Sequence, residues 1–73
     1  MSIAARTVHL AVKVESLRAV RDELRVAEAY LNYRQAVVVF KEGFSSFWVT
    51  PEGKTLELEI SPTHDGWQII LLE

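Results

Sequence analysis

The sequence predicts an α+β domain of two layers, in which one amphipathic helix packs on an antiparallel sheet in the order strand, helix and four further strands (β-α-β-β-β-β). Two observations support this prediction. Only the segment from Ser16 to Arg34 has apolar residues at a helical period, whereas the other apolar residues alternate or form short runs. Turn sequences that contain glycine separate these runs after the helix. A chain of 73 residues has room for one domain, which we take to be 1–73.

The helix is predicted from the spacing of its apolar residues. They recur at steps of three and four and therefore line one side, namely Leu17, Val20, Leu24, Ala27 and Leu31. The segment contains neither Gly nor Pro and is rich in good helix formers. Ser16 is expected to cap the start, because its hydroxyl can accept a hydrogen bond from a free amide of the first turn. Asn32 is expected to end the helix, because Asn tolerates the left-handed conformation.

Two interpretations compete for the segment before the helix, which follows an expected irregular start at residues 1–5. Val8, Val12 and Val14 alternate with polar or small residues, which is typical of a half-buried strand over residues 6–14. Apolar residues also recur every seven positions, which would instead give one long N-terminal helix followed by a four-strand meander. The strand is favoured because the segment is rich in β-branched residues and lacks a second apolar heptad position.

The segment after the helix contains an unbroken apolar run within residues 35–41. A short run of this kind is typical of a strand buried on both faces, so we expect this strand to lie in the centre of the sheet. The sequence Lys41-Glu42-Gly43 predicts a short hairpin connection, because glycine accepts a positive φ. Residues 44–50 are then the second strand of the hairpin, with Trp48 on the face opposite Phe47 and Val49.

Two more strands are predicted in the last part of the chain. Pro51-Glu52-Gly53 is a turn, and in residues 54–61 the side chains of Leu56, Leu58 and Ile60 alternate with polar ones. Residues 61–66 are expected to form a longer loop. Residues 67–72 are the last strand, and both of its faces carry apolar residues.

This architecture predicts an excess of apolar sheet surface. Five strands span roughly 20–25 Å, whereas one helix with its side chains is about 10–12 Å wide. The helix would therefore cover about half of one face. We expect the chain to bury the rest by self-association, most simply as a homodimer. The residues expected at this interface are Val37, Val39, Phe44, Trp48, Trp67, Ile70 and Leu72.

Composition narrows the classes of function. The chain has no cysteine, so neither disulfides nor a cysteine-based metal site is expected, and no cofactor is predicted. The net charge of −2 gives no electrostatic reason to expect nucleic acid or an anionic membrane as partner. No apolar run reaches transmembrane length and the first residues lack the core of a signal peptide, so the expected location is the cytoplasm.

Groups able to do chemistry are sparse, and each has an ordinary structural explanation. His64 and Asp65 lie in a loop whose turn residues account for it without catalysis. His9 is expected on the surface of the first strand, and two histidines without cysteine do not match a metal site. Glu57 and Glu59 share one strand face. Two carboxylates can do acid–base work when their environments split their pKa values, but on a solvated face they more often keep a sheet edge soluble. No base accompanies the serines at 45–46. The sequence therefore predicts no catalytic residue and no enzyme.

Two sets of side chains are candidates for binding. Arg18, Arg21 and Arg25 share a helical face that could contact anions, although acidic residues interrupt it and favour a solvated, ion-paired surface. The aromatics of the strands suit a core or a subunit interface more than base stacking, because no basic residues are interleaved with them. The expected function is a small non-enzymatic module that self-associates and binds another protein. The alternatives are single-stranded nucleic-acid binding through Trp48 or Trp67, or a small ligand held between subunits.

Overall fold

The computed structural model describes residues 5–73, so the expected irregular start of the chain lies largely outside the described residues. It confirms the α+β fold of two layers and the strand interpretation of the segment before the helix. The elements are β1 (Val8–Val14), α1 (Leu17–Tyr33), β2 (Val37–Glu42), β3 (Ser45–Val49), β4 (Thr55–Thr63) and β5 (Gly66–Leu72).

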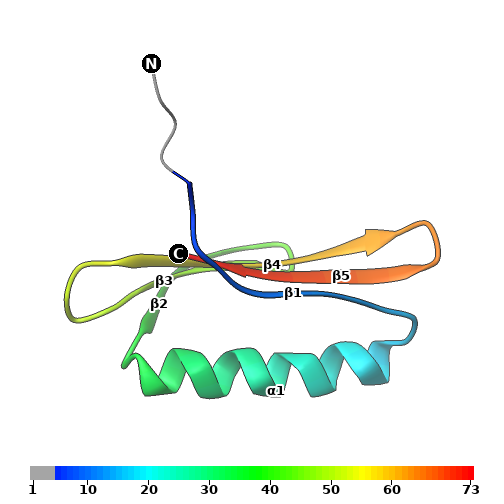
Figure 1. Ribbon diagram of the computed structural model, residues 1–73, viewed down its shortest axis with the longest axis horizontal. Helices are drawn as coiled ribbons and strands as arrows, with labels where there is room; N and C mark the ends of the chain where they lie inside the picture. The colour runs from blue at the N-terminus through cyan, green and yellow to red at the C-terminus, as the bar shows by residue number, and fades with distance from the viewer. Residues whose placement is uncertain (1–4) are drawn as a thin grey trace.

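The five strands form one antiparallel sheet in the order β1-β5-β4-β3-β2. The meander from β2 to β5 is as expected, and β1 completes the sheet by pairing with β5. Figure 1 shows α1 on one side of the sheet, and among residues 5–73 no helix or strand lies on the other side. The helix lies closest to β5 and β1. One face of the sheet is therefore covered in part, and we call the opposite face the outer face.

The core lies between α1 and the sheet face that it covers. Its buried members from the helix are Val20, Ala27 and Leu31, and those from the sheet are Leu56, Leu58, Ile69 and Leu71. The predicted helical stripe is thus confirmed except at Leu17, which is exposed because it lies at the helix start. The alternation predicted for β4 and β5 is confirmed as well, since the buried residues of both strands face α1.

The two ends of α1 differ in how well the sequence predicted them. The Ser16 hydroxyl accepts a hydrogen bond from the amide of Ala19 at 3.1 Å, which confirms the N-cap. The prediction that Asn32 ends the helix is wrong, because the helix continues to Tyr33 and it is Gln35 that takes the left-handed conformation (φ 57°). The Gln35 amide donates to the Asn32 carbonyl and the Ala36 amide to the Leu31 carbonyl, which is the Schellman pattern.

The prediction of a central strand at residues 35–41 is wrong. This segment forms β2, which pairs only with β3 and is an edge strand of the sheet. All six of its residues are exposed. The chain leaves α1 at the far side of the sheet and the meander returns toward β1, which occupies the place beside β5. Apolar residues on both faces of this strand therefore do not mean that other elements of the same chain bury it.

The turns between β2 and β3 and between β4 and β5 are tighter than expected, whereas the connection between β3 and β4 is longer and spans residues 50–54. Gly43 (φ 60°) and Phe44 form the turn between β2 and β3, so the connection lies two residues later than predicted and Phe44 is not part of a strand. Glycine at the first central position fits the type II′ turn that suits hairpins. The expected loop at residues 61–66 is shorter, because β4 continues to Thr63 and only His64 and Asp65 separate it from β5.

Candidate interaction surface

The outer face carries two apolar groups that are separated by acidic residues of β4. The first group lies on β2 and β3, where Val37 is opposite Val49 and Phe40 is opposite Phe47 with ring centroids 5.9 Å apart. The second group lies on β1 and β5 and consists of Val8, Ala11, Ile70 and Leu72. Between them, Glu57 lies opposite Phe47 on one side and Leu72 on the other, and Glu59 lies opposite Ile70.

The carboxyl groups of Glu57 and Glu59 interact with each other. A hydrogen bond from Glu59 lowers the pKa of Glu57, and the Arg6 guanidinium, whose Nη1 lies 3.1 Å from Glu57 Oε1, lowers it further. The same Glu57 contact raises the pKa of Glu59, and burial adds to this rise. These two half-buried side chains form a polar band across the middle of the outer face, and because β4 is an inner strand, the expectation that they keep a sheet edge soluble is wrong.

The free edge of β2 is the most exposed apolar part of the sheet. Four consecutive apolar residues on it, Val37, Val38, Val39 and Phe40, are 62%, 42%, 58% and 54% exposed. An edge strand also presents unpaired backbone N–H and C=O groups on the side away from its neighbour. Register shifts between Val38 and Phe40, which marks a β-bulge at Val39. We call residues Val37–Glu42, with this free backbone, the β2 edge.

The seven residues predicted at an interface are not brought together into one patch. Val37 and Val39 are exposed on the β2 edge, while Ile70 and Leu72 are half-buried on the outer face near the opposite edge of the sheet. Trp48 and Trp67 are half-buried on the face toward α1 and pack against the core.

Phe44, the last of the seven, helps to line a groove between α1 and the β2–β3 hairpin. Its ring and the Trp67 ring form a T-shaped pair with centroids 5.9 Å apart, and the Phe44 side chain remains 69% exposed. The groove has a volume of about 350 Å³. Its apolar lining includes Leu24, Trp48 and Ile60, and Glu28 and Lys41 supply one charge of each sign.

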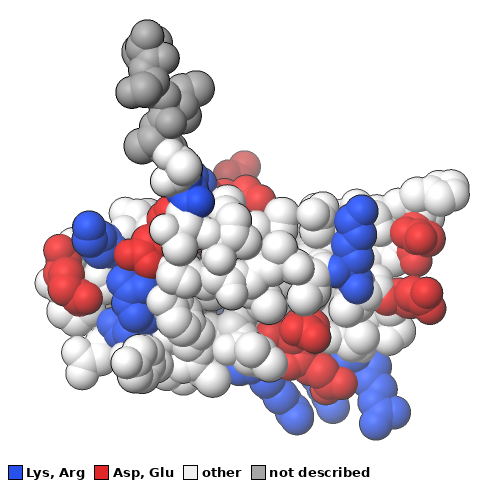
Figure 2. Space-filling view, in the orientation of Figure 1, with Lys and Arg blue, Asp and Glu red and all other residues white. Residues whose placement is uncertain are grey.

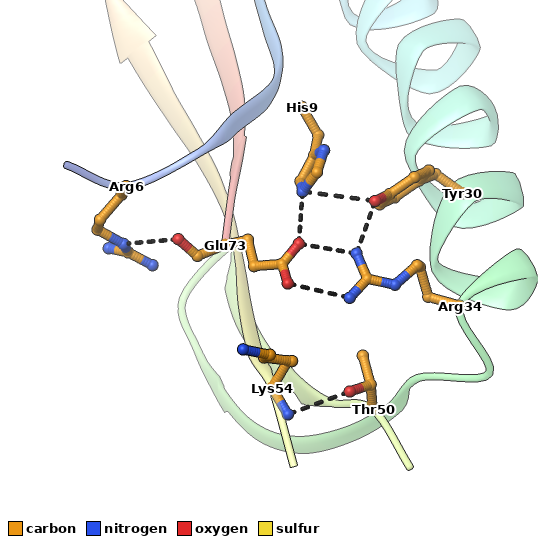
Figure 3. Close-up of polar contacts among 7 residues, drawn as sticks. All are labelled: Arg6, His9, Tyr30, Arg34, Thr50, Lys54 and Glu73. Carbon is orange, nitrogen blue, oxygen red and sulfur yellow. Dashed lines mark hydrogen bonds and ion pairs between the residues drawn. The ribbon is translucent and has the colours of Figure 1, made fainter. Parts of the chain in front are cut away.

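A polar cluster that was not predicted from the sequence joins the end of α1 to β1 and to the residue after β5 (Figure 3). It consists of His9, Tyr30, Arg34 and Glu73. Arg34 donates to both carboxylate oxygens of Glu73, at 2.7 and 3.0 Å, and also to the Tyr30 hydroxyl at 2.7 Å. His9 Nε2 lies 2.7 Å from Glu73 Oε1 and 3.4 Å from the Tyr30 hydroxyl oxygen.

The polar cluster has the chemistry of a structural clamp. The Arg34 and His9 contacts lower the pKa of Glu73 to about 2, so its carboxylate is charged under ordinary conditions. The pKa of Arg34 is raised, first by Glu73 and then by Tyr30. The polar groups of these four side chains bond to one another, and none of the four lines the groove described above. Such an arrangement holds elements together, whereas a catalytic site needs a group free to meet substrate.

The expectation that His9 is an ordinary surface residue is wrong, and the reason is a second bulge. Register shifts between Val8 and Leu10 in β1, so that Val8 lies on the outer face while His9 and Leu10 both lie toward α1. The His9 side chain is thereby 21% exposed and within reach of the helix. No local sequence signal marks this bulge, since the contacts join residues up to 64 positions apart.

The remaining candidates are solvated. Arg18, Arg21 and Arg25 are exposed on the helix, and Figure 2 shows acidic and basic side chains side by side along the lower border, where α1 lies. His64 and Asp65 are exposed at the β4–β5 turn. Within residues 5–73, no three His, Asp or Glu side chains are grouped so as to hold a metal ion. The helix in this range does not combine the length and the apolar character that crossing a bilayer requires.

Within residues 5–73, the β2 edge and the apolar residues beside it form a surface whose exposure no contact inside the chain explains. Comparison of the chain with protein-family models, curated proteins and solved structures found no match, so the interpretation of this surface rests on the chain's own residues.

Proposed function

We propose that this chain is a small non-enzymatic module that self-associates through its sheet and, as an oligomer, binds another protein. The observation that carries the proposal is the β2 edge, on which four consecutive apolar side chains are each between 42% and 62% exposed. Monomeric proteins seldom leave such a contiguous apolar patch in water. A second copy that covers it would contribute roughly 25 cal/mol for each Å² of apolar surface removed from water.

The size of the domain supports the same proposal. A chain of 73 residues has a small core, and within residues 5–73 seven apolar residues are buried between one helix and one sheet face. The sequence has no cysteine to add disulfides. Association with a further copy is an ordinary way for so small a domain to gain stability.

Catalysis and base stacking have less support than self-association. Among the described residues, the cluster richest in ionisable groups is that of His9, Arg34 and Glu73. The polar groups of these side chains bond to one another. Trp48 donates its indole N–H to the Ser46 hydroxyl at 2.8 Å and packs against the core, so its ring is not a free stacking platform.

Self-association is tested by sedimentation equilibrium over a range from about 1 to 500 µM, the span in which an interface of modest size dissociates. We expect the mass to rise with concentration from one chain to two. The variant Val39→Lys should shift this transition to higher concentration by tenfold or more, because it places a charge in the interface.

Val26→Lys is the matched control, since Val26 on the helix is 57% exposed and Val39 is 58% exposed. The control should associate like the parent chain. A mass of one chain at every concentration would contradict the proposal, and equal effects of the two lysines would exclude the β2 edge as the surface involved.

The groove beside Phe44 supports a second candidate function, the binding of a small apolar or aromatic ligand. Its volume of about 350 Å³ is near the lower limit for ligand pockets. Native mass spectrometry of the purified protein would reveal a retained ligand. Replacement of Phe44 by Ser should release that ligand without changing the oligomer mass, and a protein that carries no extra mass and binds no aromatic probe would exclude this function.

A further inference from the structure

We infer that the β2 edge pairs antiparallel with the β2 edge of a second copy, so that two five-stranded sheets join into one continuous sheet with both helices on the same side. This inference rests on the proposed self-association and specifies its geometry. It follows from a comparison of the two sheet edges, from the charges of the outer face and from the pattern of side chains along β2.

The two edge strands of the sheet, β1 and β2, differ in how much of their surface is free to pair with a second copy. The edge formed by β1 lies close to α1, three of its residues pack against the core, and Lys13 interrupts its exposed side. No residue of β2 is among those that pack against the core, and all six are exposed. Charged residues are a common protection of free edges. On β2 the only two, Lys41 and Glu42, lie at one end, so Val37–Phe40 carries no charged side chain and has only the bulge at Val39 to interrupt pairing.

Stacking of two outer faces is the other way to bury apolar surface, and the charges of β4 oppose it. Face-to-face contact would remove Glu57 and Glu59 of both copies from water. One nearby cation, Arg6, contacts Glu57, whereas the pKa of Glu59 is already raised by its neighbour and by burial. Buried carboxylates without partners are costly. Pairing through β2 leaves these side chains in water.

The bulge in β2 makes the strand complementary to itself. Val37 and Phe40 are three positions apart, yet both lie on the outer face, because their partners Val49 and Phe47 are two positions apart on β3. A two-fold axis perpendicular to the sheet and between Val38 and Val39 therefore places Val37 beside Phe40 of the second copy, on the same face. In this register all four apolar residues meet apolar residues across the junction.

The charged end of β2 selects the antiparallel orientation. In a parallel pairing, Lys41 would meet Lys41 and Glu42 would meet Glu42, and like charges opposite each other are destabilising. In the antiparallel register, Lys41 meets Ala36 and Glu42 meets Gln35 of the second copy, so no like charges face each other.

Disulfide cross-linking of single-cysteine variants tests this geometry cleanly, because the natural chain has no cysteine. In this register the two Val39→Cys residues lie on adjacent strands and are offset by about one residue along them. Their Cα atoms are then within the separation that a disulfide spans. Glu42→Cys places them about 23 Å apart in the same register. Lys13→Cys reports pairing through β1, and Glu59→Cys reports stacking of the outer faces. All four positions are exposed or half-buried, so the substitutions leave the core intact.

Under mild oxidation at a concentration where the parent chain is dimeric, Val39→Cys should cross-link in most molecules and Glu42→Cys at least tenfold less. Cross-linking of Lys13→Cys or Glu59→Cys in preference to Val39→Cys would overturn the β2 pairing, and so would a dimer in which none of the four cross-links. In those cases self-association itself would stand. A parent chain that sediments as a monomer at every concentration would overturn both proposals.

Discussion

The guanidinium of Arg34 and the carboxylate of Glu73 form a two-pronged ion pair, with Nη1 to Oε1 at 2.7 Å and Nη2 to Oε2 at 3.0 Å. Arg34 follows the last residue of α1, and Glu73 follows the last residue of β5. The pair therefore links the end of α1 to the end of β5 (Figure 3). Because Arg34 also donates to Tyr30, the link extends back into the last turn of the helix.

Replacing Arg34 by Lys should destabilise the domain although the charge is kept. A lysine ammonium cannot present two parallel N–H donors to one carboxylate and also reach Tyr30 with the same geometry. The midpoint of urea unfolding should fall for Arg34→Lys and stay unchanged for Arg25→Lys, whose parent side chain is exposed on the helix. Equal midpoints for Arg34→Lys and the parent would show that the two-pronged geometry adds nothing beyond the charge.

The stability of the domain should depend on pH through Glu73. The pKa of this carboxyl is lowered from its ordinary 4.5 to about 2 in the folded chain, first by Arg34 and then by His9. Since the folded-state pKa is the lower one, the stabilisation is fully present above pH 4.5 and is lost as pH falls from 4.5 toward 2.

Urea unfolding of the parent and of Glu73→Gln across this range measures the effect. The difference in unfolding free energy between the two should shrink toward zero as pH falls from 4.5 to about 2, in line with the protonation of the carboxyl group. A difference that does not change between pH 5 and pH 2 would refute the assignment of the low pKa to Glu73.

Gly66 should not tolerate a side chain. A Cβ at this position would overlap the carbonyl oxygen of Val14 in the neighbouring strand β1. Because this atom belongs to the backbone, one strand must move, and Gly66→Ala should lower the unfolding free energy by about 1–3 kcal/mol. Gly43→Asn is a comparison of another kind, since nothing lies within 4 Å of a Cβ there and its cost comes from the positive φ of 60° alone. A Gly66→Ala variant as stable as the parent chain would contradict the predicted overlap with the Val14 carbonyl oxygen.

Gln35 is a site where substitution should stabilise the chain. It holds a φ of 57° at the position of the Schellman motif that usually carries glycine. Left-handed backbone costs a non-glycine residue roughly 1–2 kcal/mol, and glycine loses about 0.5–1 kcal/mol more conformational freedom on folding. Gln35→Gly should therefore raise the unfolding free energy by about 0.5 kcal/mol. The control Gln68→Gly, in the middle of β5, should lower it. Thermal unfolding of both variants would test this, and a less stable Gln35→Gly would show that the helix end is not strained.

The kinds of element and most of their limits were predictable because the responsible forces are local. The helical stripe of Val20, Ala27 and Leu31 and the cap at Ser16 depend on residues within one or two turns. The alternation in β4 likewise shows which side of this strand is buried, and it can be read without knowing which strands lie beside it. Chain length and the absence of cysteine were enough to suggest that the domain gains stability by association.

Strand order was decided by long-range pairing, and with it the place of β2. The unbroken apolar run in β2 has the composition of a central strand, yet β1 takes the position beside β5 and leaves β2 at the edge. A sequence pattern records that both faces of a strand are apolar and carries no information on which neighbour covers them. The sequence singled out Val37 and Val39, but only the assembled sheet shows that they lie with Val38 and Phe40 on a free edge.

The amino-acid order alone specified one amphipathic helix, five strands and more apolar surface than a single helix can cover, because periodicity and turn chemistry act over a few residues. Only the folded chain decided which surface stays uncovered. It also placed the two bulges, one of which turns His9 inward while the other brings Val37 and Phe40 to one face, and it brought Glu73 to Arg34. These features join residues that are distant along the chain, and their free energy depends on the simultaneous position of several elements.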